Sequence, residues 1–192
     1  MEVRERVFNA MAELARSRGL HAITMDELAE AAGVSKRTVY RYFPGKEQVV
    51  EGMIGQFALE VESGIAGILA GGARPREKLR LLATHLHERL SLLDPPSMAD
   101  LQRHYPAVWQ KLEDFRSQKV MLLEGLITEG IACGDFRRVD PALAASAFLG
   151  MARTIITPAF ILNHSLSIAE ALQMVFDLFL YGLTAPPPKE LP

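Results

Sequence analysis

Residues 31–46, AAGVSKRTVYRYFPGK, contain four basic side chains and no acidic one, although the whole chain has a net charge of −2. The four cations are Lys36, Arg37, Arg41 and Lys46. Ammonium and guanidinium groups bind phosphate oxygens and the acceptor edge of guanine. Ser35 can cap a short helix that starts here, and Pro44 disfavours helix at the residue before it. The first turn of this helix has two cations and no carboxylate, which suits an external anion such as a phosphate.

A second short helix is predicted immediately upstream, over residues 24–32. Thr24 and Glu27 have the spacing of a capping box, in which each side chain binds the backbone N–H of the other residue. Gly33 lies where a tight turn would separate the two helices. Two short helices joined by a turn that contains glycine form the helix-turn-helix pattern. The second helix of this motif enters the major groove of DNA.

Residues 20–50, LHAITMDELAEAAGVSKRTVYRYFPGKEQVV, resemble the DNA-binding segment of the TetR family of bacterial transcription regulators. The matching positions include helix starts, the turn and several basic or aromatic residues that would not serve a core. They are Thr24, Leu28-Ala29, Ala32-Gly33-Val34-Ser35, Thr38-Val39-Tyr40, Tyr42-Phe43 and Lys46-Glu47.

The resemblance implies a role for each matching polar residue. Lys36, Arg37 and Arg41 occupy positions that face base edges in this family. The expected phosphate contacts are Thr38, Tyr40, Tyr42 and Lys46, together with Thr24 and Ser35 at the helix starts. Tyr40 and Tyr42 can instead be partly buried beside Phe43, which we expect in the core rather than on DNA.

The composition is that of an ordinary globular protein, with 49% hydrophobic and 23% charged residues. The single cysteine, Cys133, excludes an intramolecular disulfide and fits a reducing compartment. The N-terminus lacks the pattern of a signal peptide. The apolar run over residues 142–162 is long enough to span a bilayer, but Arg153 at its middle is costly in lipid. We therefore expect a cytoplasmic protein that does not enter a membrane.

The sequence contains no pattern that predicts catalysis. Nucleophile elbows, phosphate-binding loops, zinc signatures and paired carboxylates of diagnostic spacing are all missing from it. His85 and His87 lie two residues apart on a predicted helix and so face different sides, which makes a poor metal pair. We expect no enzymatic activity, no cofactor and no metal site.

Hydrophobic periodicity predicts about nine helices and no strand, so the fold class is all-α. The expected helices cover residues 2–17, 24–32, 35–42, 46–69, 76–93, 97–104, 106–132, 140–163 and 168–184. Asp94-Pro95-Pro96 is expected to stop one helix, and Ser97 to cap the next. We predict two domains: a three-helix DNA-binding domain over residues 1–46 and an effector-binding and dimerisation domain over residues 47–192.

The larger domain resembles that of TetR-family regulators only in its helical layout, which implies ligand binding and dimerisation. His85, Trp109, Phe115 and Arg153 lie on helices that would line the effector pocket. Arg153 can instead reach water or pair across an interface. The last two long helices, residues 140–163 and 168–184, have more apolar surface than one neighbour can cover, so we expect them to form a homodimer. Phe176 and Phe179 are predicted to matter for it.

The sequence thus predicts a regulator that binds double-stranded operator DNA. In this family such a protein is usually a repressor, released from a palindromic operator by a small effector, here a largely apolar one. Two alternatives remain. A helical ligand-binding enzyme or carrier with an incidental helix-turn-helix would show turnover and no salt-sensitive DNA binding. A constitutive DNA-binding protein would not respond to any ligand.

Overall fold

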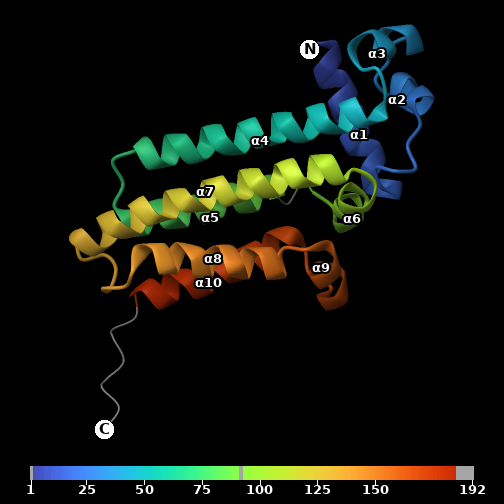
Figure 1. Cartoon of the computed structure of the whole chain (residues 1–192). Coiled ribbons are helices and arrows are strands. Elements are labelled where there is room, and N and C mark those ends of the chain that lie inside the picture. Colours follow the sequence, from blue (N-terminus) through green and yellow to red (C-terminus); the bar gives the residue numbers. More distant parts are fainter. Residues whose placement is uncertain (1, 91–92, 185–192) are drawn as a thin grey trace. The chain divides into compact units, whose positions relative to one another are not determined.

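A computed structural model describes residues 2–90 and 93–184 of the chain. Within these residues it contains ten α-helices and no strand, which confirms the all-α fold class (Figure 1). The helices are α1 (Val3–Arg18), α2 (Met25–Ala31), α3 (Lys36–Tyr42), α4 (Lys46–Ala70), α5 (Pro75–Leu90), α6 (Pro95–His104), α7 (Pro106–Ala132), α8 (Pro141–Ile155), α9 (Pro158–His164) and α10 (Ile168–Thr184). The expected end of the fifth helix at Leu93 falls beside residues 91–92, which lie outside the described residues.

The chain divides into two compact units. The first consists of Met1–Glu60 and Leu93–Glu113, and the second of Val61–Leu92 and Asp114–Pro192. Both boundaries fall inside long helices, since α4 passes from the first unit to the second at residue 60 and α7 does so at residue 113. Two uninterrupted helices therefore connect the units.

One apolar core holds the first unit together. Helices α2 and α3 have seven residues each, and helices of this length are not stable alone in water. They depend on burying Leu28, Ala29 and Val39 against neighbouring helices. The same core includes residues from α1, α4, α7 and the end of α6: Val7, Met11, Val49, Val50, Leu101, Tyr105 and Val108.

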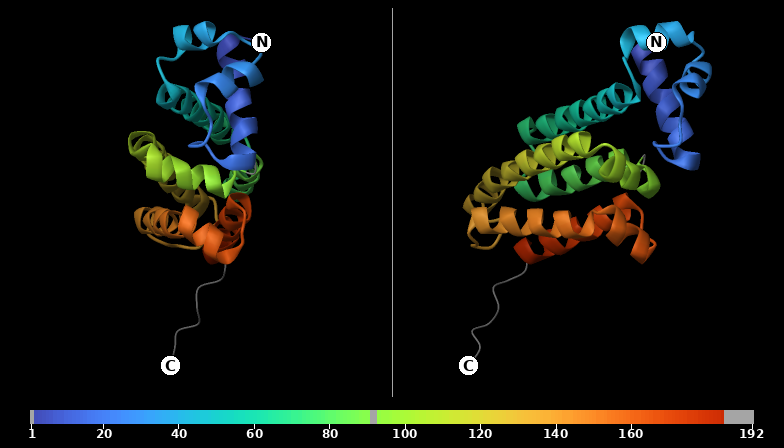
Figure 2. Two further views of the ribbon diagram at one scale, coloured as in Figure 1. Left: turned by 90° about the vertical axis from the view of Figure 1, so that its right-hand side faces the viewer. Right: turned by 45° about the vertical axis from the view of Figure 1, so that its right-hand side comes forward.

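The second unit is organised around α10, which packs along α5 and α8. Figure 2 shows α8 (orange) and α10 (red) side by side in both views. The ring of Phe148 on α8 meets the rings of Phe176 and Phe179 on α10 edge to face, with centroids 4.8 and 5.0 Å away. Phe176 and Phe179 are thus buried within one protomer, with 3% and 7% of their surface exposed, rather than held ready for an interface between copies.

Two features of the helices differ from the sequence-based expectation. The Asp94 side chain accepts the N–H of Ser97 (2.7 Å), so Asp94 caps α6 and both prolines lie in its first turn. Proline lacks the N–H that a first turn leaves unpaired, which makes this position favourable for it. Ser97 is therefore not the cap, and the Asp-Pro-Pro sequence starts a helix as well as following one.

The expected helix over residues 140–163 is two helices, which is why the structure has ten rather than about nine. α8 ends at Ile155, α9 begins at Pro158, and their axes differ by 66°. Thr157 caps α9 by accepting the N–H of Phe160 (3.3 Å). Proline cannot complete the hydrogen-bond pattern of a continuing helix and clashes with the preceding turn. A capping residue directly before Pro158 therefore starts a new helix at this point.

Membrane-spanning potential is confined to two places in the described part of the chain. By length and composition, α4 could cross a membrane. α8 and α9 meet the same criteria only when the bent pair is counted as one span. Core helices of soluble proteins meet these criteria too. In the first unit, α4 buries Val49, Val50 and Ile54 in the shared core.

Ionisation of Glu27 should contribute to stability. The N–H and hydroxyl of Thr24 each donate to its carboxylate at 2.8 Å, and so does Arg18. These bonds lower the pKa of Glu27 from 4.5 to about 2, the backbone N–H having the largest effect. Because the folded state favours the ionised form, this stability is fully present above pH 4.5 and is lost as the pH falls towards 2.

We therefore expect Glu27→Gln to lower the free energy of unfolding most at neutral pH. The difference from the wild type should shrink between pH 4.5 and 2, as measured by urea unfolding at several pH values. Parallel stability curves across that interval would show that the carboxylate charge has no such role.

Candidate nucleic-acid interface

Helix α3 presents most of its surface to solvent. Val39 is its buried residue, whereas Lys36, Arg37, Tyr40 and Arg41 are exposed. Their spacings of three and four residues place these four side chains on one side of the helix. The fold thus uses one residue to fix α3 to the core and leaves a basic and aromatic surface for a ligand.

Local capping fixes the start of α3. The Ser35 hydroxyl accepts the N–H of Thr38 at 3.1 Å and lies 2.8 Å from the Thr38 hydroxyl. Thr24 caps α2 in the same way, accepting the N–H of Glu27 at 3.2 Å. The hydroxyls of Thr24, Ser35 and Thr38 therefore already have partners within the motif, and a phosphate would have to share them.

The aromatic residues of this segment are either buried or exposed, and Phe43 is in the core as the sequence predicted. Phe43 is buried, with 4% of its surface exposed, and its ring lies 5.4 Å from that of Phe8. Tyr40 and Tyr42 are 44% and 37% exposed. The Arg41 guanidinium lies 5.2 Å from the centre of the Tyr42 ring, at cation–π distance. Both tyrosine side chains are thus partly accessible to solvent, and that of Tyr42 lies beside one of the cations.

Lys36 does not point freely into solvent. Its ammonium contacts both carboxylate oxygens of Asp26, at 2.6 and 2.9 Å. The hydrogen bond to Asp26, and then the charge of that carboxylate, raises the pKa of Lys36. The sequence does not show this pair, because Lys36 and Asp26 lie ten positions apart on two helices and the turn between them brings them together.

Lys46, at the start of α4, holds the loop between α1 and α2. Its ammonium donates to the carbonyls of His21 and Ile23 at 2.6 and 3.0 Å. Partial burial lowers the pKa of Lys46, while the charge of Asp100 opposes this change. Lys46 is therefore a structural cross-link as well as a candidate phosphate contact.

Helix α6 also holds this loop. The N–H of His21 donates to Asp100 at 2.8 Å, and the rings of His21 and His104 stack with centroids 3.8 Å apart. Another contact missed by sequence reasoning is Arg6 of α1, which donates to the carbonyl of Gly33 in the helix-turn-helix turn at 2.7 Å. The sequence shows that Asp100 and His104 share a helix face, but not which loop that face meets.

The four residues predicted to line an effector pocket lie in different places. Trp109 packs partly buried against the core of the first unit. Phe115 and Arg153 belong to the second unit, where Arg153 donates to the Ser117 hydroxyl at 2.8 Å and Lys119 lies 5.2 Å from the Phe115 ring centre. His85 packs against Gly64 of α4 so closely that a side chain at position 64 would collide with its ring. The Nε2 atom of His85 is buried without a hydrogen-bond partner in the described residues.

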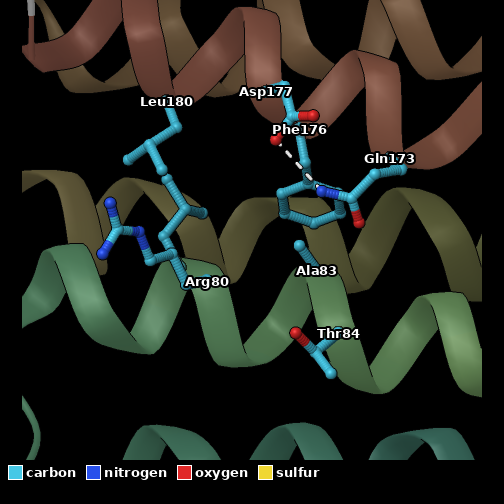
Figure 3. Close-up of a pocket in the computed structure, with 8 residues that line it drawn as sticks. Arg80, Ala83, Thr84, Gln173, Phe176, Asp177 and Leu180 are labelled. Carbon is cyan, nitrogen blue, oxygen red and sulfur yellow. Dashed lines mark hydrogen bonds between the residues drawn. The ribbon is translucent and has the colours of Figure 1, made fainter.

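A groove of about 340 Å³ lies between α5 and α10 (Figure 3). Leu79, Ala83, Phe176 and Leu180 form its apolar part, and Arg80, Thr84, Gln173 and Asp177 its polar part. Gln173 donates to Asp177 at 3.0 Å. None of the predicted pocket residues lines this groove. Within the described residues, no group of three or more His, Cys, Asp or Glu side chains could hold a metal ion.

Comparison with known proteins identifies two family models along the chain. One, described as bacterial regulatory proteins of the tetR family, matches residues 7–53. The other, a tetracyclin repressor-like C-terminal domain, matches residues 75–175. Together they cover the helix-turn-helix and most of the second unit.

Individual relatives match nearly the whole chain. The HTH-type transcriptional regulator YvaF of Bacillus subtilis (strain 168) is 27% identical over 165 residues, which is 85% of this chain and 87% of the relative. A transcriptional regulator from Cytophaga hutchinsonii has a similar structure, with a TM-score of 0.75 and 22% identity over 94% of this chain and 98% of that one. The regulator FadR of Bacillus subtilis in complex with stearoyl-CoA superposes with a TM-score of 0.62, 23% identity and coverage of 93% and 98%.

Binding of double-stranded DNA should depend strongly on salt. Lys36, Arg37, Arg41 and Lys46 supply four cations per protomer and eight per dimer. If about five to seven of them neutralise phosphates, the slope of log affinity against log salt concentration should be about −4.5 to −6. Fluorescence anisotropy titrations between low and moderate salt would measure it, and a slope near zero would contradict DNA binding by this surface.

Proposed function

The chain belongs to the TetR family of bacterial transcription regulators, and we propose that it acts as a homodimeric repressor that a largely apolar ligand releases from a palindromic operator. The observation that carries this proposal is the exposed surface of α3, whose cations are held on a capped helix next to the start of α4. Residues 1–46 would bind DNA, and residues 47–192 would bind the effector and dimerise.

We assign DNA contacts from the position of each side chain in the motif. Lys36, Arg37 and Arg41 would read base edges, since Arg and Lys donate to the guanine acceptors O6 and N7. Phosphate contacts would come from hydroxyl groups and from the start of α4. They are Thr24, Ser35, Thr38, Tyr40, Tyr42 and Lys46. The exposure of Tyr40 and Tyr42 supports this assignment.

The dimer would form through apolar side chains that α8 and α10 leave uncovered in one protomer. On α10, Met174, Leu178 and Tyr181 are 53%, 64% and 75% exposed, and their spacing of four and three residues makes a single stripe. On α8, Leu143 is 70% exposed. Ala147 and Gly150 are also exposed and lie on the same face of the helix. Small residues of this kind allow two helices to approach closely, so a second copy of both helices fits this surface.

The stripe rather than the phenylalanine core should control the oligomeric state. We expect Leu178→Glu with Tyr181→Glu to give a soluble monomer in sedimentation velocity, because two carboxylates would be buried in the interface. Met121→Glu on α7 is the matched control, since Met121 is also more than half exposed but lies on neither helix. A double variant that still sediments as a dimer would place the interface elsewhere.

The ligand would be held by the helices of the second unit, whose buried side chains are almost all apolar. Lys78 is the buried charged residue among those described, and Glu129 on α7 accompanies it at 3.7 Å. The unpartnered Nε2 atom of His85 would offer one polar anchor for such a ligand. The complex of FadR with stearoyl-CoA has the same fold, which supports a long-chain acyl group as the ligand class.

Ligand binding would act on DNA through α4. This helix starts two residues after Pro44 and continues without a break into the second unit. A two-fold dimer must hold its recognition helices about 34–36 Å apart to enter successive major grooves. A ligand that prefers an arrangement of α4 with a different spacing would release the operator, and DNA must then weaken the ligand by the same factor.

Calorimetry with stearoyl-CoA as the probe tests this coupling. We expect its affinity for the protein to fall at least about fivefold when the preferred DNA site, selected from a random pool, is present in excess. A mutated duplex that the protein does not bind is the control. Absence of binding would contradict the acyl ligand class. Equal affinities with and without operator would contradict the release mechanism and favour a constitutive DNA-binding protein.

A further inference from the structure

We infer that Asp26 is a specificity-determining residue, which holds the Lys36 ammonium as an oriented donor for a base edge and prevents it from acting as a free counterion for phosphates. The inference rests on the proposed function of α3 as the recognition helix. Asp26 belongs to α2, and the helix-turn-helix pattern alone shows only that it lies in the first turn of that helix.

The geometry of the pair fixes the direction of the ammonium. Asp26 lies in the first turn of α2, Lys36 is the first residue of α3, and the two helices pack against each other (Figure 1). Both carboxylate oxygens contact the same ammonium, so this side of the ammonium is held by Asp26. An ammonium has three N–H donors, so donor capacity remains on its other side for another acceptor.

The pair lies on the surface that would face DNA. The side chains of Lys36 and Asp26 are 58% and 66% exposed, and both are open to solvent beside the exposed side of α3. An exposed ion pair has a small free energy of formation, so its contribution to folding is minor. Its consequence is electrostatic, because it places a carboxylate among the cations that attract phosphates.

The other acid in this turn behaves differently. Glu27 faces back into the motif, where Thr24 and Arg18 bind its carboxylate. An acid in the first turn of a helix is favourable in general, and Glu27 already meets that need and completes the capping box. Asp26 instead directs its carboxylate at a recognition-helix cation, which local helix stability does not require.

This arrangement separates specific from non-specific binding. Non-specific affinity comes from cations that neutralise phosphates, each adding about 0.9 to the salt slope. A lysine that is already paired adds little to it. At the correct base pair, the side of the Lys36 ammonium that faces away from Asp26 can donate to a guanine acceptor in a fixed orientation. Asp26 thus lowers affinity for random DNA more than affinity for the operator.

The test compares Asp26→Asn, Lys36→Met and the double variant. Asparagine keeps the shape and the polar contact of the first turn but removes the charge. We expect Asp26→Asn to raise affinity for a scrambled duplex about tenfold at 0.1 M salt and to steepen its salt slope by about one per protomer. The ratio of operator affinity to scrambled-duplex affinity should fall. In the Lys36→Met background, the same change should leave the slope unaltered.

Two controls separate this role from simpler ones. Glu13→Gln removes one exposed acid from α1 and should change neither the slope nor the ratio. Thermal unfolding should show that Asp26→Asn and Asp26→Ser remain folded, and both should have the same effect on scrambled DNA. An equal gain of affinity in the wild-type and Lys36→Met backgrounds would overturn the inference, because only bulk charge would then matter. An unchanged specificity ratio would overturn it as well.

Failure of the inference is distinguishable from failure of the proposed function. If the wild type shows no salt-dependent operator binding, the DNA-binding role of α3 is wrong and the role of Asp26 falls with it. If the wild type binds its operator and Asp26→Asn behaves like Glu13→Gln, only the role of Asp26 is wrong.

Discussion

The shared apolar core of the first unit is the constraint on which the presentation of α3 depends. A seven-residue helix forms at most a few internal hydrogen bonds, so it needs tertiary contacts to persist. Val39 supplies the contact from α3, and Leu28 and Ala29 supply it from α2. Since Val39 is the buried residue of α3, the other side chains of this helix remain partly or fully exposed. The basic surface therefore depends on the packing of a short helix through Val39, and not on a long helix that is stable by itself.

That core also explains why α6 and the start of α7 belong to the first unit. Leu101, Tyr105 and Val108 complete it although they lie far along the chain. Asp100 and Lys46 bind opposite groups of the same loop, the N–H of His21 and the carbonyls of His21 and Ile23. A displacement of α6 would reach the helix-turn-helix through this loop, in addition to any displacement that α4 transmits. The helix-turn-helix thus has two physical connections to the rest of the chain, one through α4 and one through α6.

The charge that the exposed side of α3 presents depends on the partners of its basic side chains as much as on their number. Four cations stand in residues 31–46 without an acid among them, yet Asp26 holds one and backbone carbonyls hold another. Arg37 and Arg41 are the remaining two, and Arg41 lies over Tyr42. The number of basic residues therefore overstates the positive charge that is free to attract an anion.

Local sequence patterns determined where several helices of this protein begin. The capping box of Thr24 and Glu27 and the Ser35 cap both appear as the sequence predicted. They act within one helical turn, so their partners are three residues away and can be read directly. The family motif over residues 20–50 indicated the function for the same reason, because its residues are contiguous.

Only the tertiary structure decided which long-range partner each residue meets. It turned Phe176 and Phe179 inward, placed Trp109 against the first unit, broke the helix at Pro158 and paired Lys36 with Asp26. Periodicity shows that a helix has an apolar face but not which neighbour covers it, since that depends on how the whole set of helices buries its surface together.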